Sequence, residues 1–312
     1  MDALRRVSDW PVDRAAVAVF RFDPLSGAAR RHDFDVVGTV GDSEDPLPWA
    51  SVTKPATALA VLVAVEEGTL SLDDPAGPPG STVRHLLAHT SGLAPEGGPV
   101  LAAPGRRRIY SNAGYALLGD LLSRRAGLTF ADYLAMGVLE PLGMSGTSLR
   151  GVGGGGESGT GSRSGRPGSP ATSPAASPAA AGLVGPLVDL VALGREWAAP
   201  TLVSPETHRT ATSVQFPTVA GVLPGFQRFD PCEWGLGVEI RGHKQPHWTG
   251  GANAPATYGH FGRSGSFLWV DPVAGVGCAG LSDRPFGPWA AQGWPALADA
   301  VLAEVSGTGA TR

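Results

Sequence analysis

The segment of residues 56–67 constrains the fold most. It consists almost entirely of Ala, Leu and Val, and it is followed by Gly68. A helix that is apolar on most of its faces must be surrounded by other elements, so this segment predicts a buried helix. The 312 residues, 42% of them hydrophobic, are enough to build a core around it.

Strand patterns lie at both ends of the chain. The sequence predicts an antiparallel hairpin over 15–22 and 33–40, then further strands over 234–240, 257–261, 266–270 and 274–281. Helical patterns fill the middle and close the chain, at 82–89, 112–126, 130–139, 186–198 and 289–305. The expected fold class is therefore α+β: an antiparallel sheet formed from both chain ends, flanked by helices, with an inserted helical region.

This order predicts two interleaved subdomains. Residues 1–75 and 225–312 would form the sheet subdomain, and residues 76–224 a mainly helical one. Within the second, residues 151–181 are mostly Gly, Ser, Pro, Ala and Thr. Such a composition buries too little surface to offset its ordering entropy, so we expect an irregular loop there.

Charge and hydropathy exclude several functional classes. The net charge is −4 and no basic stripe appears, which argues against a nucleic-acid partner. The densest basic run, residues 106–108, is expected at a solvated loop edge. Residues 1–20 lack the apolar core of a secretory signal, and no stretch is long enough to cross a bilayer. We therefore expect a soluble cytoplasmic protein without a membrane partner.

The cysteines and histidines do not predict a metal site. Cys232 and Cys278 are far apart, and Cys278 lies in an apolar run typical of a buried small residue. His243 and His247 are accompanied by no carboxylate cluster, so we expect them in a surface loop between strands. No cofactor is expected.

The first candidate site element is Ser51-Val52-Thr53-Lys54, immediately before the predicted buried helix. Pro55 fits the first turn of a helix, and a serine at a helix start is close to the positive end of the helix dipole. Lys54 lies one turn further on, so both side chains share one face. Ser51 alone could equally be an ordinary N-cap, but an unpaired lysine beside a buried helix would be costly. Lysine is also scarce, since Lys54 and Lys244 are the only two.

The second element is Tyr110-Ser111-Asn112, just before the helical pattern at 112–126. Beside a lysine ammonium, Tyr110 could have a lowered pKa and act as a base. The Asn112 amide could hold both Lys54 and a substrate carbonyl. Taken alone, the element is better explained by an ordinary loop aromatic residue at Tyr110 and an N-cap at Asn112.

The third element is the strand pattern around His260, which glycines flank on both sides, at Gly259 and Gly262. Glycine in a strand often marks close approach of a ligand or another backbone. A backbone N–H from this strand edge could join that of Ser51 as an oxyanion hole. His260 could also be merely a satisfied, half-buried histidine.

Together these elements resemble the serine β-lactamase and penicillin-binding-protein superfamily. The order Ser-x-x-Lys, Tyr-x-Asn and (Lys/His)-x-Gly is similar to class C β-lactamases and to family VIII carboxylesterases and D-aminopeptidases. Four further stretches match, at 85–93, 110–115, 140–144 and 259–262. The resemblance covers roughly residues 12 to 305.

The resemblance implies an α+β fold with the active site between the sheet and the helical region. It implies acylation of Ser51, with Lys54 and Tyr110 sharing the proton transfers and Asn112 positioning the substrate. His260 would take the place of the usual third-motif lysine.

The resemblance also implies that the N–H groups of Ser51 and Arg263 hold the oxyanion. His89 and Ser91 would be structural. The partner would be a small-molecule acyl substrate.

Two departures from the family pattern, the third motif and the Gly/Ser/Pro-rich stretch at 151–181, together with the missing secretory signal favour an esterase or amidase over a β-lactamase. The third motif reads His-Phe-Gly instead of Lys-Thr-Gly, which weakens recognition of a penicillin carboxylate, because the His260 pKa is ordinarily about 6.5. A β-lactamase or D-Ala-type peptidase is the second hypothesis. The third is a non-catalytic penicillin-binding-like regulatory domain.

Overall fold

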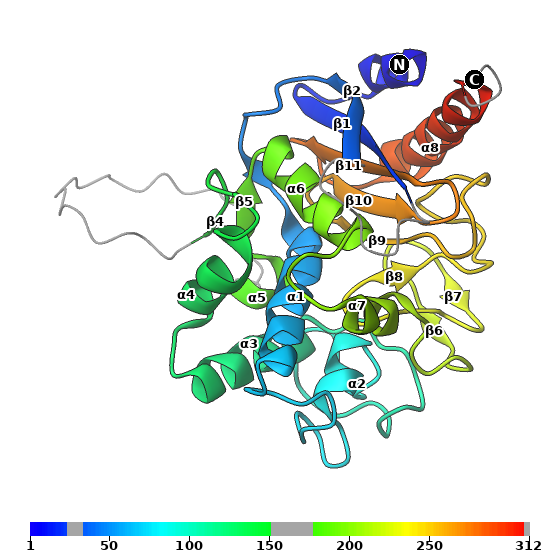
Figure 1. Ribbon diagram of the computed structural model, residues 1–312. Helices are drawn as coiled ribbons and strands as arrows, with labels where there is room; N and C mark the ends of the chain where they lie inside the picture. Colours follow the sequence, from blue (N-terminus) through cyan, green and yellow to red (C-terminus); the bar gives the residue numbers. More distant parts are fainter. Residues whose placement is uncertain (24–33, 151–176, 309–312) are drawn as a thin grey trace, which may run out of the picture.

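The computed structural model describes residues 1–23, 34–150 and 177–308, and its centre is a six-stranded sheet (Figure 1). The strand order is β2-β1-β11-β10-β9-β8, and every neighbouring pair is antiparallel. The strands are β1 (Ala15–Phe22), β2 (Phe34–Val40), β8 (Glu239–Ile240), β9 (Tyr258–Gly262), β10 (Ser266–Asp271) and β11 (Val276–Ser282). The two chain ends meet where β1 pairs with β11, which confirms the predicted α+β fold.

Helices cover both faces of this sheet (Figure 1). On one face, α6 (Leu187–Ala198) packs against β1, β10 and β11 and shares a core with α1 (Thr53–Glu66). On the other face, α8 (Pro288–Thr308) and the 3₁₀ helix η1 (Asp2–Asp9) form a second core. Alternate residues of β1 serve the two cores, as strand geometry requires.

The helix α1 is buried along nearly its whole length, as predicted. Around it lie α2 (Val83–Leu87), α3 (Asn112–Ala126) and α4 (Phe130–Leu134), which continues into the π-helical turn η4 (Ala135–Leu139). Leu59 and Leu62 are at most 1% exposed. Burial of each such side chain stabilises the fold by about 1.5–3 kcal/mol, so the helical region is anchored on α1.

The remaining elements are short. They are β3 (Leu47–Pro48), η3 (Ala50–Val52), β4 (Ser148–Leu149), α5 (Pro178–Ala181), β5 (Leu183–Gly185), α7 (Pro205–Thr212), β6 (Gly221–Val222) and β7 (Arg228–Phe229). The order β3-β5-β4 makes a small sheet, and β6 pairs with β7. Among the described helices, none is both long and apolar enough to cross a membrane.

The predicted strand over 234–240 is wrong except for Glu239–Ile240. Its backbone groups bond elsewhere: Leu236 N–H donates to Ala211 O and Gly237 N–H to Leu87 O. Gly237 has φ +92, and a Cβ there would lie 2.1 Å from the Cβ of Ala58. The segment therefore turns toward α1 instead of extending the sheet.

The expected irregular loop is wrong over its last residues. Residues 151–176 lie outside the described part, but Pro178–Ala181 forms the helical turn α5 with Ala179 and Ala180 buried. Small side chains permit this approach, because Ala179 packs against Gly119 of α3.

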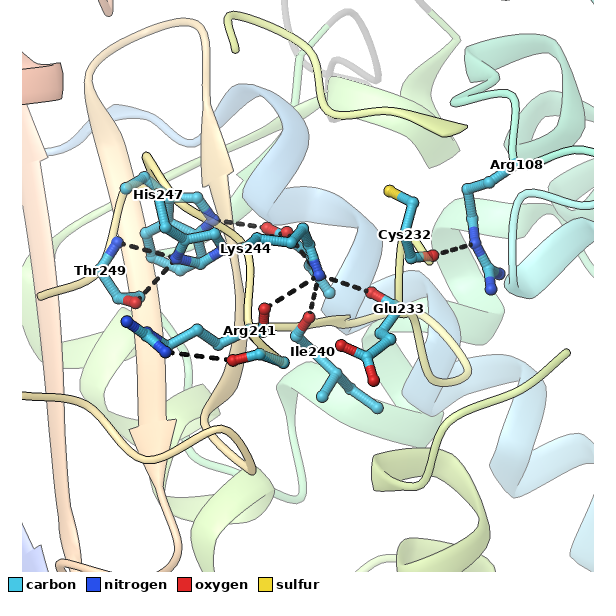
Figure 2. Close-up of polar contacts among 11 residues, drawn as sticks. Arg108, Cys232, Glu233, Ile240, Arg241, Lys244, His247 and Thr249 are labelled. Carbon is cyan, nitrogen blue, oxygen red and sulfur yellow. Dashed lines mark hydrogen bonds and ion pairs between the residues drawn. The ribbon is translucent and has the colours of Figure 1, made fainter. Parts of the chain in front are cut away.

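In two loops expected at the surface, some side chains are buried instead (Figure 2), although Arg106, Arg107 and His243 are exposed as predicted. Arg108 is 3% exposed, and its guanidinium donates to the carbonyls of Ala88, Cys232 and Gln215. Lys244 is 2% exposed and pairs with Glu239 at 3.4 Å, while its ammonium also donates to Glu233 O at 3.2 Å. These loops turn their carbonyls inward, and a buried carbonyl needs a donor.

His247 belongs to the same buried cluster as Lys244. Its Nε2 lies 3.0 Å from a Glu239 carboxylate oxygen, and its Nδ1 accepts from the Thr249 N–H at 3.1 Å. The predicted surface position is therefore wrong for His247, which is buried, whereas His243 is exposed as predicted.

Candidate active site

Ser51 lies in the 3₁₀ turn η3, between strand β3 and helix α1. It is half-buried, whereas the flanking Trp49 and Val52 are fully buried. Ala50, which precedes it, has φ 45, a left-handed conformation that costs energy for a residue with a Cβ. Ser51 therefore does not cap the helix; a strained turn presents it.

The end of β9 and the start of β10 hold this turn in place. The hydroxyl of Ser266 donates to Trp49 O at 2.6 Å, and that of Ser264 donates to Pro48 O at 2.6 Å. A Cβ at Gly262 would lie 2.5 Å from Trp49 O. Glycine is required there because the two backbones touch, and this contact brings the Gly262-Arg263 edge to the Ser51 turn.

Lys54 is fully buried beneath Ser51. Its Nζ lies 3.3 Å from Ser51 Oγ, 2.7 Å from Asn112 Oδ1 and 2.9 Å from Ala180 O. Burial lowers the Lys54 pKa to about 7, although Glu96 opposes this effect. A large fraction of Lys54 is thus a neutral amine near pH 7, next to the serine hydroxyl.

Asn112 is the first residue of α3, and Ser111, not Asn112, is the N-cap, since its Oγ accepts from the Gly114 N–H. This arrangement leaves the Asn112 amide free to bridge Lys54 and Glu96. Its Oδ1 accepts from Lys54, and its Nδ2 donates to Glu96 Oε1 at 2.7 Å. The two bonds fix which way the amide points.

Tyr110 lies over Lys54, with Nζ 4.7 Å from the ring centroid. Its hydroxyl is buried and has no hydrogen-bond partner among the described residues. The prediction of a lowered Tyr110 pKa is wrong. Burial raises the pKa well above its ordinary value, although the nearby Ser51 hydroxyl partly opposes the rise. Tyr110 therefore stays protonated at neutral pH.

His89 and Trp234 fix the Tyr110 ring. The His89 ring lies 4.5 Å from that of Tyr110 and 4.8 Å from that of Trp234, centroid to centroid. His89 Nδ1 accepts from the Ser111 N–H at 3.1 Å, which anchors the segment before α3. This agrees with the structural role expected for His89.

His260 on β9 faces the same aromatic cluster, with its ring 5.8 Å from that of Tyr110. It is 3% exposed, and its Nδ1 lies 2.7 Å from the carbonyl of Phe261. Because a carbonyl only accepts, Nδ1 carries the proton and Nε2 is bare. Burial, together with the nearby Lys54, lowers the His260 pKa to about 3, so the ring is neutral and does not replace the charge of a lysine.

The structure thus brings Ser51, Lys54, Tyr110, Asn112 and His260 together, with Gly262 and Arg263 at the adjoining turn. Sequence reasoning missed two contributors, Glu96 and the Ala180 carbonyl. Glu96 follows the 85–93 stretch in a loop without periodicity, and a backbone carbonyl leaves no trace in residue type. Neither had a local signal.

An antiparallel sheet flanked by helices, with a serine and a lysine one helical turn apart beside a Tyr-x-Asn segment, defines a serine hydrolase with the β-lactamase fold. The Beta-lactamase family matches residues 42–303. The chain belongs to that family.

Individual proteins similar to this chain are consistent with the family match. A crystal structure of a β-lactamase from Mycobacterium bovis is 45% identical and superposes with a TM-score of 0.83, covering 97% of this chain and 99% of that one. A Bacillus subtilis penicillin-binding protein is 31% identical over 133 residues, which span 32% of this chain and 30% of that protein. The hydrolase EstCE1, 20% identical with a TM-score of 0.70 and 96% coverage of both chains, shares the fold.

Proposed function

We propose that this serine hydrolase is an esterase or amidase that works through an acyl-enzyme on Ser51. The observation that carries the proposal is the 3.3 Å approach of the buried Lys54 Nζ to Ser51 Oγ. A neutral amine at that distance is a general base for the hydroxyl.

In the acylation step, Ser51 Oγ attacks the acyl carbon while its proton passes to the Lys54 amine. The lysine then becomes an ammonium, held by Asn112 Oδ1 and Ala180 O. The N–H groups of Ser51 and Arg263 would stabilise the oxyanion, and the Gly262 contact with Trp49 supports that placement.

When the tetrahedral intermediate collapses, the leaving group takes a proton from the Lys54 ammonium. The unpartnered, protonated Tyr110 hydroxyl is a hydrogen-bond donor for that leaving group. Water then attacks the acyl carbon, with Lys54 again taking the proton. Ser51 is regenerated and the acid is released.

The neutral His260 supports esters and amides over β-lactams, because no lysine at this position attracts the substrate carboxylate. A β-lactamase is the second candidate. It is supported by the 45% identity to the Mycobacterium bovis β-lactamase over nearly the whole chain.

Hydrolysis of p-nitrophenyl acetate and butyrate, beside a chromogenic cephalosporin, tests both candidates, with Ser51→Ala as the control. We expect ester turnover that disappears in the variant and little cephalosporin turnover. Fast cephalosporin turnover would favour the β-lactamase. No turnover of either substrate, and no labelling of Ser51 by a fluorophosphonate, would support the non-catalytic alternative.

A further inference from the structure

We infer that His89 is a positioning residue for the proposed reaction, because it holds Tyr110 where the tyrosine hydroxyl can reach the leaving group. The inference rests on the proposed function and adds a residue beyond those that would carry the proton transfers. It starts from three contacts that His89 makes with Tyr110 and with the residues on either side of Tyr110.

His89 is hydrogen-bonded to both chain neighbours of Tyr110. Its carbonyl accepts from the Ile109 N–H at 2.8 Å, and its Nδ1 accepts from the Ser111 N–H at 3.1 Å. A single residue, which follows the end of α2, therefore brackets Tyr110 from both sides. These two bonds fix the course of the backbone that carries the tyrosine ring.

The imidazole also packs on the Tyr110 ring itself. The two ring centroids are 4.5 Å apart at an interplanar angle of 37°, and Trp234 meets the imidazole edge-on at 4.8 Å and 88°. The Tyr110 hydroxyl has no hydrogen-bond partner among the described residues. The ring contacts and the two backbone bonds therefore determine where the hydroxyl points, since no bond at the hydroxyl does so.

His89 occupies this position at a cost in stability. Its φ is 57, a left-handed conformation that residues with a Cβ rarely adopt. Because Nδ1 accepts an N–H, the ring proton is on Nε2, which is buried and has no partner among the described residues. Backbone strain and an unpaired buried donor both destabilise the folded state. Packing alone requires neither, so the arrangement points to a role in the reaction.

The imidazole is neutral, which suits this role. Burial lowers the His89 pKa well below its ordinary value, and the charge of the nearby Lys54 lowers it further. A neutral ring adds no positive charge beside Lys54. His89 can therefore orient Tyr110 without opposing the ammonium that the proposed acylation step forms on Lys54.

A double-mutant cycle with Tyr110→Phe separates positioning of the hydroxyl from support of the fold. His89→Asn tolerates the positive φ and offers an acceptor to the Ser111 N–H, but it removes the ring. His89→Gly tolerates the positive φ and removes both. His208→Asn is the matched control, because His208 is a half-buried histidine outside the candidate site, with Nε2 2.8 Å from Trp197 O.

Each protein is assayed for kcat/KM with p-nitrophenyl butyrate, and urea unfolding identifies the variants that fold. We expect His89→Asn to lower kcat/KM about ten-fold and His89→Gly about 100-fold, because small displacements of a reacting group reduce rates by such factors. In the Tyr110→Phe background, both changes should lower kcat/KM by less than about two-fold, since no hydroxyl is left to position. His208→Asn should leave kcat/KM unchanged in either background.

Equal fold-losses with and without the Tyr110 hydroxyl would mean that His89 only supports the fold. That result, or no loss from either change at His89, would overturn the inference and leave the proposed function intact. If His89→Asn does not fold, His89→Gly takes its place in the cycle. If the parent shows no Ser51-dependent turnover, the proposed function fails and the inference falls with it.

Discussion

Lys54 should make the stability of the protein depend on pH in a way that Lys54→Met removes. The lysine is fully buried, and burial lowers its pKa from 10.5 to about 7. In the unfolded chain it keeps its proton up to about pH 10.4. Between these two pKa values the unfolded state binds more protons than the folded state, so the free energy of unfolding rises with pH.

The magnitude follows from that difference. Each pH unit inside the window is worth about 1.4 kcal/mol, so burying Lys54 costs about 4–5 kcal/mol at or below pH 7. This cost declines toward zero as the pH approaches 10.5. Relative to Lys54→Met, the parent should gain about 3 kcal/mol between pH 6 and pH 9.

Urea unfolding of both proteins at several pH values measures this difference. Titrating groups that do not interact with Lys54 cancel in the comparison, whereas the loss of donors to Asn112 Oδ1 and Ala180 O adds an offset that does not vary with pH. Lys54→Gln keeps a donor for these acceptors and provides a second variant if Lys54→Met does not fold. A difference in unfolding free energy that is flat from pH 6 to pH 9 would refute the reasoning.

Three further outcomes are expected. The kcat/KM for p-nitrophenyl butyrate should rise about ten-fold per pH unit at low pH and level off with a midpoint near pH 7, because the neutral Lys54 amine is the base in the proposed mechanism. A profile with no inflection between pH 6 and pH 8 would contradict this. Tyr110→Phe should lower that kcat/KM at least about 100-fold, because it removes the proposed donor to the leaving group. It should change the unfolding free energy by under about 0.5 kcal/mol, because the hydroxyl has no partner among the described residues. A large loss of stability in urea would point to a structural role. Gly262→Ala should lower the free energy of unfolding by about 1–3 kcal/mol and remove most of the activity, because its Cβ would lie 2.5 Å from Trp49 O. Gly251→Ala, whose Cβ would have its nearest contact at 3.8 Å, should behave like the parent in both assays.

Much of the fold was predictable because hydrophobic periodicity is local. The helix α3 with its Gly127 C-cap and the strands β9 to β11 appear within a residue or two of the expected bounds, and the buried helix α1 begins three residues before the expected segment. These elements bury one regular face or all faces, and the sequence pattern records that burial directly.

What could not be predicted depends on contacts between distant segments. Lys244 looks like a surface residue in sequence, but Glu239 and inward carbonyls hold it in the interior. The segment 234–238 has the apolar residues of a strand, yet its backbone bonds to the ends of α2 and α7. Hydrophobic periodicity indicates neither the burial of Lys244 nor the turn of the segment 234–238, because tertiary partners set both.

In the candidate site, too, the sequence predicted some features and not others. Residue types predicted Ser51 and Lys54 as candidate site residues, because a lysine has few reasons to follow a serine into a buried helix. Residue types could not give the protonation states. For Tyr110 the sequence predicted a lowered pKa, whereas burial raises it. Burial acts on both groups, lowering the pKa of the lysine and raising that of the tyrosine, so the same low-polarity surroundings favour a neutral base beside a neutral donor. The proposed chemistry therefore depends on how completely α1, α3 and α5 exclude water from Lys54, which is a property of their packing and not of the motif.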